Sequence, residues 1–137
     1  MPACVLRVHG SATKVRAFLS QSRLRPSAVF FKGDPGFPKS RGPAKTSGFN
    51  IPLTSNKYGA SLWKQSSAAA TYLRGRREDL QRMRRVGFKR AVLDFGLYDR
   101  ATAKHPWPSY ALCRQLVAIA GEFRFDIELS FYGREQQ

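Results

Sequence analysis

Acidic residues are scarce in this chain of 137 residues, which contains nine Asp and Glu against 24 Lys and Arg. Asp34 is the only acid before Glu78, so the first half of the chain is an almost purely cationic field. The formal net charge of +15 exceeds what solubility requires, and it costs self-repulsion in the folded state. The charge balance therefore favours an anionic partner, either an acidic protein or a nucleic acid.

Long apolar runs and groups of cysteines are also missing. No run of about 18 apolar residues exists, so we expect no membrane-spanning helix. The first residues, MPACVLRVHGSATK, lack an apolar run long enough for a signal peptide. Because the same residues are basic and poor in acids, a transit peptide that directs the chain to an organelle stays an alternative interpretation. The two cysteines, Cys4 and Cys113, form no paired or metal-spaced set, which predicts a reducing, cytoplasmic location and no bound metal. A disulfide between them stays an open alternative.

The periodicity of the apolar residues predicts a single α+β domain over residues 1–137. Strands are expected at residues 4–9, 28–32, 49–53 and 90–98, and in the final segment FRFDIELSFYG. Helices are expected from Ser11 or Thr13 to about Gln21, over residues 61–86 with a break at Gly75, and over residues 109–123. A basic loop, residues 33–47, is too rich in Gly and Pro for regular structure.

The order β-α-β-β-α-β-α-β predicts a ferredoxin-like β-α-β-β-α-β unit with an appended α-β, in which a mostly antiparallel sheet carries its helices on one face. Pro52 has no N–H to donate, which predicts that its strand lies at a sheet edge or carries a bulge. In the last helix and strand the periodicity points four residues inward, and we expect burial of Leu116, Ile119, Leu129 and Phe131.

Several strings of the chain are similar to those of a known family: FFKGDPGFPKS with the later SGFN, then VLDFGLYDR, then LVAIAGEFRFDIELSFYG. They follow one another in the right order over nearly the whole chain, which resembles the bacterial family catalogued as domain of unknown function 4279. The resemblance implies a small α+β domain, with some relatives that look like immunity or interaction proteins, and it carries over no catalytic residue. This chain is much more positive than is usual in that family, so a role common to neutral or acidic relatives does not transfer directly.

The segment RGRREDLQRMRRVGFKR, residues 74–90, concentrates positive charge. Its pattern predicts a helix that docks through a narrow apolar seam, Leu73, Leu80 and Met83, and shows its arginines to solvent. Arginine suits bidentate contact with phosphate, so the segment is a candidate polyanion-binding site; the alternative is an ordinary solvated helix face. The candidate residues are Arg74, Arg76, Arg77, Arg82, Arg84, Arg85, Lys89 and Arg90.

The Gly/Pro-rich loop adds three candidate cations, Lys39, Arg41 and Lys45. Its string GPAKTSG is similar to a phosphate-binding loop, but such a loop needs Gly before the Lys and a helix directly after it. Here Ala44 precedes Lys45 and a strand is expected next. We therefore expect a cationic surface loop rather than a nucleotide site.

One face of the predicted sheet is polar and is the place for an enzyme site if one exists. His9 lies on it beside Arg7, and we expect the same face to carry Asp94, Tyr98, Asp126, Glu128, Ser130 and Tyr132. Such residues support acid–base chemistry, but the same pattern describes any solvated sheet face. No nucleophile elbow or metal-ligand spacing is present, and His105 lies in a connector. The acids also repel phosphate, which disfavours RNA binding on this face.

These features predict a small, strongly basic, non-catalytic binding domain without a cofactor, of the kind that immunity proteins represent. Its partner is an acidic protein or a nucleic acid, and its oligomeric state is open. Two alternatives remain: a nucleic-acid-binding protein that does not read sequence, and an enzyme with its site on the open sheet face.

Overall fold

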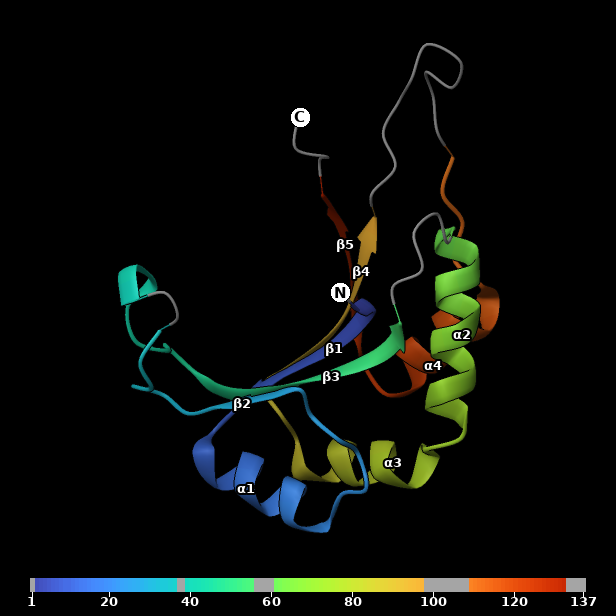
Figure 1. The fold of residues 1–137 in the computed structure, drawn as a ribbon. Coiled ribbons are helices and arrows are strands. Elements are labelled where there is room, and N and C mark those ends of the chain that lie inside the picture. Colours follow the sequence, from blue (N-terminus) through green and yellow to red (C-terminus); the bar gives the residue numbers. More distant parts are fainter. Residues whose placement is uncertain (1, 37–38, 56–60, 98–108, 133–137) are drawn as a thin grey trace.

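The computed structural model describes residues 2–36, 39–55, 61–97 and 109–132. These residues form a five-stranded sheet with the order β2-β3-β1-β4-β5 and four α-helices (Figure 1). The strands are β1 (Pro2–Gly10), β2 (Ala28–Phe30), β3 (Ser47–Ser55), β4 (Arg90–Leu97) and β5 (Asp126–Phe131). The helices are α1 (Ala12–Gln21), α2 (Leu62–Arg74), α3 (Arg77–Val86) and α4 (Arg114–Glu122), with a 3-10 turn, η1 (Lys39–Arg41).

The sheet is mixed. β1 pairs antiparallel with both β3 and β4, and β2 pairs antiparallel with β3, whereas β4 and β5 run parallel. The four α-helices lie along one side of the sheet, and the other side is free of described helices (Figure 1). The predicted α+β class is therefore confirmed, with one parallel strand pair in a sheet whose other pairs are antiparallel.

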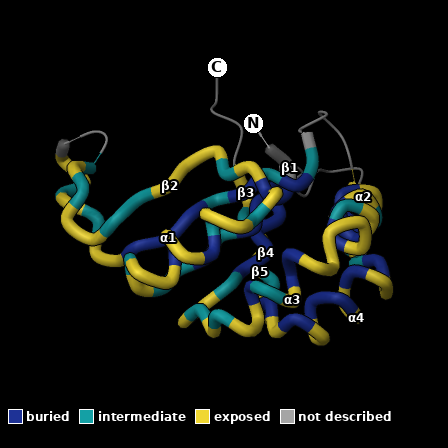
Figure 2. The backbone as a smooth tube through the Cα atoms, turned by 90° about the horizontal axis from the view of Figure 1, so that it is seen from below, coloured by how far each residue is buried: buried dark blue, intermediate teal, exposed yellow. Residues whose placement is uncertain are grey.

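The core lies between the sheet and the helices. Alternation in β1 sends Leu6 toward the helices, where it pairs with Ile51 of β3 and Leu93 of β4, and all three are fully buried. Figure 2 shows buried positions where the strands meet the helices, and exposed positions on the outer helix turns and along β2. Complete burial of one such side chain contributes about 1.5–3 kcal/mol relative to exposure.

Local capping sets the predicted helix boundaries. The Ser11 hydroxyl accepts a hydrogen bond from a backbone N–H in the first turn of α1. The predicted break at Gly75 is confirmed, because it separates α2 from α3. α3 ends at Gly87, whose φ of 73° is left-handed and favours glycine. The apolar seam predicted across this break is also buried at Leu73, Leu80 and Met83.

The prediction that Leu129 and Phe131 are buried is wrong. Leu116 and Ile119 of α4 are buried as predicted, but Leu129 is 37% exposed and Phe131 is 59% exposed. β5 is an edge strand of the sheet, and α4 packs mainly against α2. Periodicity gives the face on which a side chain lies, but not whether a neighbouring element covers it.

The last helix starts later than its sequence pattern indicates. Residues 109–113 are not helical, and α4 begins at Arg114. The backbone N–H of Cys113 donates to the Ser66 hydroxyl of α2 at 2.8 Å, and the Cys113 backbone is extended. A tertiary hydrogen bond therefore takes the place of an additional helical turn.

The β2–β3 hairpin also differs from the prediction. β2 ends at Phe30 rather than at residue 32, because the Asp34 carboxylate accepts the Phe31 backbone N–H at 2.7 Å. The loop 33–47, predicted to be irregular, contains the 3-10 turn η1. Of the two alternatives predicted for the strand of Pro52, a sheet edge is wrong, because β3 lies between β2 and β1. The pairing of β1 with β3 shifts register beside Pro52, which is consistent with the predicted bulge.

Both cysteines are free and buried. In the part of the chain that the structure describes, no helix has the length and apolar character needed to cross a membrane. Two residues of the sequence predictions lie outside the described residues: Tyr98, expected on the open sheet face, and His105, expected in a connector.

Candidate functional site: a cationic cavity at the start of two parallel strands

Two turns that enter the parallel strands β4 and β5 lie side by side. Residues 87–89 lead from α3 into β4, and residues 123–125 lead from α4 into β5. Because Val92 pairs with Asp126, both turns lie at the same end of the sheet. A cavity of about 310 Å³ lies between them.

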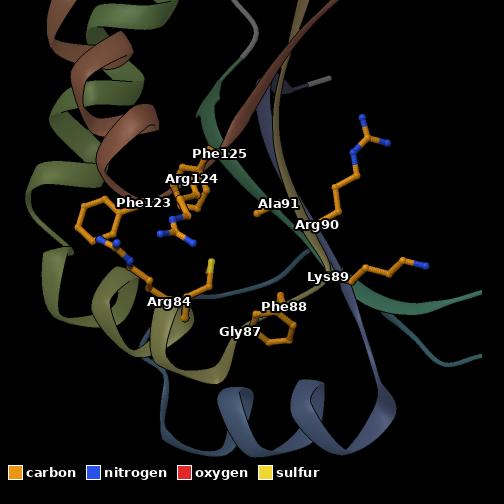
Figure 3. Close-up of a pocket in the computed structure, with 10 residues that line it drawn as sticks. Arg84, Gly87, Phe88, Lys89, Arg90, Ala91, Phe123, Arg124 and Phe125 are labelled. Atoms are coloured by element: carbon orange, nitrogen blue, oxygen red, sulfur yellow. The ribbon is translucent and has the colours of Figure 1, made fainter.

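Four cations and a set of apolar side chains line this cavity. The cations are Arg84, Lys89, Arg90 and Arg124. The apolar lining consists of Met83, Phe88, Ala91, Phe123 and Phe125. In Figure 3 the side chains of Arg84 and Arg124 lie on the side of Phe123, whereas those of Lys89 and Arg90 extend away from the cavity.

Arg124 has an unusual backbone conformation. Its φ is 60°, and it is the only residue other than glycine with a positive φ among the described residues. It directly follows the end of α4, where the N–H of Phe125 donates to the carbonyl of Ala120 at 2.8 Å. Glycine is usual at this position, and a residue with a side chain costs about 1–2 kcal/mol there. Strain of this kind is concentrated at functional sites, which makes Arg124 a candidate binding residue.

The acids near the cavity neutralise only part of its charge. Arg90 pairs with Asp126 at 3.5 Å, and both side chains are more than half exposed. Arg84 donates to the backbone carbonyl of Glu122 at 3.0 Å, which uses one of the five N–H donors of its guanidinium. Lys89 and Arg124 have no ion-pair partner within the described ranges. The cavity therefore keeps positive charge that an anion can satisfy.

The structure separates the eight cations predicted in residues 74–90. Three make intramolecular contacts outside the cavity: Arg76 with the ring of a neighbouring tyrosine, Arg77 with a carboxylate of α4, and Arg82 with two carboxylates of its own helix and a carbonyl of α1. Two others, Arg74 and Arg85, are exposed and form no ion pair with a described acid. The three that reach the cavity are Arg84, Lys89 and Arg90.

Arg124 is absent from the cations predicted from the sequence. Its signal is a charged residue between Phe123 and Phe125, directly after a helix, in a segment whose pattern indicates apolar burial. The pairing of β4 with β5 then places this residue on the same cavity as Arg84. That juxtaposition depends on tertiary structure.

The loop cations lie elsewhere, on the β2–β3 hairpin at the far end of the sheet order from β5 (Figure 1). Lys39 and Arg41 belong to η1, and both Arg41 and Lys45 are exposed. The strand β3 follows Lys45, so the segment lacks the helix that a phosphate-binding loop requires. Neither Arg41 nor Lys45 lines the cavity.

The face of the sheet away from the helices carries a polar network. Arg7 donates through Nε to the Asp94 carboxylate at 3.2 Å, and the Ser130 hydroxyl donates to the same carboxylate at 2.6 Å. His9 does not take part in this network; its Nδ1 lies within hydrogen-bond distance, 3.1 Å, of the Thr46 hydroxyl. Asp94 is thus held by structural partners other than His9. Within the described ranges, no group of three or more His, Cys, Asp or Glu could hold a metal ion.

The surroundings of His9 give a prediction about pH. Partial burial lowers the pKa of His9 below its ordinary value of 6.5, and the charges of Arg90 and Arg7 lower it further. As the pH falls below 6.5, the unfolded chain takes up a proton on His9 before the folded protein does, so stability is lost. We expect His9→Gln to flatten the dependence of Tm on pH between about pH 7 and pH 5. A variant that loses Tm as steeply as the wild type over this range would contradict the assignment.

No protein-family model matches the chain, and comparisons with curated proteins and with solved structures give no match either. The resemblance to domain of unknown function 4279 therefore stays a prediction.

Proposed function

We propose that this protein is a non-catalytic domain that binds nucleic acid through the phosphate backbone, without reading base sequence. The proposal is supported by the positive charge that remains at the cavity after its neighbouring acids are paired. Arg84 and Arg124 offer planar, multiply donating groups suited to phosphate, and Lys89 adds a charge with no acidic partner in the described part of the chain.

The distribution of acids over the fold supports the same function. Asp94 pairs with Arg7, and Glu78 and Asp79 pair with Arg82, none of which lines the cavity. Glu122 pairs with Arg77, which lies over the ring of the lining residue Phe123. Among the four lining cations, only Arg90 therefore has an ion-pair partner in the described part of the chain, Asp126. Such a surface attracts a polyanion over long distances and loses affinity as salt increases.

The fold interpretation that we propose gives the cavity a simple origin. The strands β2-β3-β1-β4, with α1 and the α2–α3 segment, correspond to a ferredoxin-like unit, and α4 with β5 is the appended part. The unit contributes Arg84, Lys89 and Arg90 to the cavity, and the appended part contributes Arg124. The binding surface would then exist only where the two parts meet.

A salt titration tests this function. The double variant Lys89→Gln with Arg124→Gln removes two candidate phosphate-binding groups and leaves the buried core unchanged. We expect weaker binding to a random duplex and a log–log salt slope that is shallower by about 0.9 for each phosphate that is no longer neutralised. Fluorescence anisotropy of a labelled duplex at several salt concentrations measures both quantities.

The matched control is the double variant Lys64→Gln with Arg114→Gln. Lys64 is exposed in the first turn of α2, and Arg114 is exposed in the first turn of α4, at the opposite end of that helix from Arg124. The control variant loses the same net charge as the test variant. We expect it to keep the wild-type slope. Equal slope changes in both variants would show that net charge alone drives binding. Binding of a single acidic protein in fixed stoichiometry, with no binding to the duplex, would support the immunity-protein alternative instead.

A further inference from the structure

We infer that the open face of the sheet binds unpaired bases of a single-stranded nucleic acid, which stack on the rings of Phe30 and His9. This surface lies on the side of the sheet away from the helices, so it is separate from the cavity (Figure 1). The inference goes beyond the proposed function. A backbone site needs only phosphates, whereas a stacking site needs bases that no second strand has paired.

Strand pairing brings the two rings together. Phe30 of β2 pairs with Gly48 of β3, and Gly48 pairs with His9 of β1, so these three positions share one face of the sheet. Gly48 has no side chain, which leaves room for the Phe30 ring: an added Cβ would lie 2.9 Å from that ring. The ring centroids of Phe30 and His9 lie 5.8 Å apart. Both residues are partly exposed, so the two rings form one aromatic surface in contact with solvent.

The ring of His9 is held in position and is uncharged at neutral pH. Its Nδ1 lies 3.1 Å from the Thr46 hydroxyl. Partial burial and the charges of Arg90 and Arg7 lower its pKa below the ordinary value of 6.5. A neutral, fixed ring can stack on a base without giving up the hydration of a cation.

Cations lie on both sides of the rings. Arg90 of β4 pairs with His9, and its side chain extends away from the cavity together with that of Lys89 (Figure 3). On the side of β3, the exposed Lys45 directly precedes Thr46. Neither Lys45 nor Lys89 forms an ion pair with a described acid. A phosphodiester strand that stacks its bases on the rings therefore meets positive charge on both sides of them.

The acids of this face leave the rings accessible to such a strand. Asp94 is buried and pairs with Arg7. Asp126 pairs with Arg90. Glu128 belongs to β5, at the opposite edge of the sheet from β2. The repulsion of phosphate that the sequence predicts for this face therefore acts at β5, away from Phe30.

The decisive variant is Phe30→Leu, which removes an aromatic ring without changing any charge. Its matched control is Phe131→Leu, at an exposed phenylalanine on the other edge strand. Affinity is measured for a labelled oligothymidylate and for an abasic strand with the same number of phosphates. We expect the wild type to bind the oligothymidylate roughly tenfold more tightly than the abasic strand, and Phe30→Leu to lose most of this preference at unchanged affinity for the abasic strand. Phe131→Leu, and Phe30→Tyr, which keeps a ring, should match the wild type.

The outcomes separate the inference from the proposed function. No binding to any polymer by the wild type overturns both. Equal binding of the two single strands by the wild type overturns the inference alone, because the proposed function requires only phosphates. A preference that Phe30→Leu retains, or that Phe131→Leu loses equally, also overturns it. If Phe30→Leu does not fold by circular dichroism, His9→Gln decides: we expect the preference to fall several-fold, and an unchanged preference would overturn the inference.

Discussion

Replacing Phe95 by alanine is expected to lower the free energy of unfolding by about 3–5 kcal/mol. Phe95 is fully buried in β4, and its Cα pairs with Cys4 of β1 on one side and with Leu129 of β5 on the other. Removing its ring leaves a void at the centre of the sheet that rigid neighbouring strands cannot close. Equilibrium denaturation in urea measures the change. A domain of this size has a total stability of roughly 5–15 kcal/mol, so much of it would be lost.

Leu129→Ala on the neighbouring strand is the matched comparison. Leu129 occupies the position beside Phe95, but its side chain is 37% exposed at the edge of the sheet. We expect a loss of about 1 kcal/mol or less, because much of the side chain already contacts water. If both substitutions cost the same, β5 must be covered in solution, and the exposure of this edge would be contradicted.

This pair of substitutions shows what the sequence could predict about the fold. The alternation of apolar residues predicts the sheet face of Phe95 and of Leu129 equally well, because it depends only on the two-residue repeat of a strand. Whether a helix covers that side chain depends on where the helices lie. The helix α4 is shortened by the hydrogen bond from Cys113 to Ser66, which joins residues 47 positions apart in the sequence. Local signals such as Gly75 and Gly87 were sufficient for the helix boundaries that they control.

The candidate site was predictable only in part, for a related reason. The concentration of arginine in residues 74–90 is visible in the sequence, and three of its cations do line the cavity. The spacing of four residues between Glu78 and Arg82 indicates their ion pair, which the structure contains. The sequence does not reveal that Arg77 pairs with Glu122, since Glu122 comes from another helix. The fourth cation, Arg124, joins the site through the parallel pairing of β4 with β5. Charge content is thus local information, whereas the availability of each charge is tertiary.

Replacing Gly48 by alanine is the second change with a large expected effect. Gly48 pairs with His9 of β1 and with Phe30 of β2, so it lies inside the sheet. A Cβ at this position would lie 2.1 Å from the carbonyl oxygen of Val8 and 2.9 Å from the ring of Phe30. The ring can turn away, but the Val8 carbonyl belongs to the backbone, so β1 and β3 must separate locally. Because each broken ladder hydrogen bond costs about 0.5–1.5 kcal/mol, we expect a loss of roughly 2–4 kcal/mol in the free energy of unfolding.

Gly121→Ala is the control that isolates this steric cause. Gly121 lies in α4, where an added Cβ meets nothing within 4 Å, and its φ is not positive. Alanine is the better helix former, so this variant should gain up to about 1 kcal/mol. The two substitutions add the same methyl group, and denaturation in urea should move the two variants in opposite directions from the wild type. A Gly48→Ala variant as stable as the wild type would mean that β1 and β3 do not approach as closely as described.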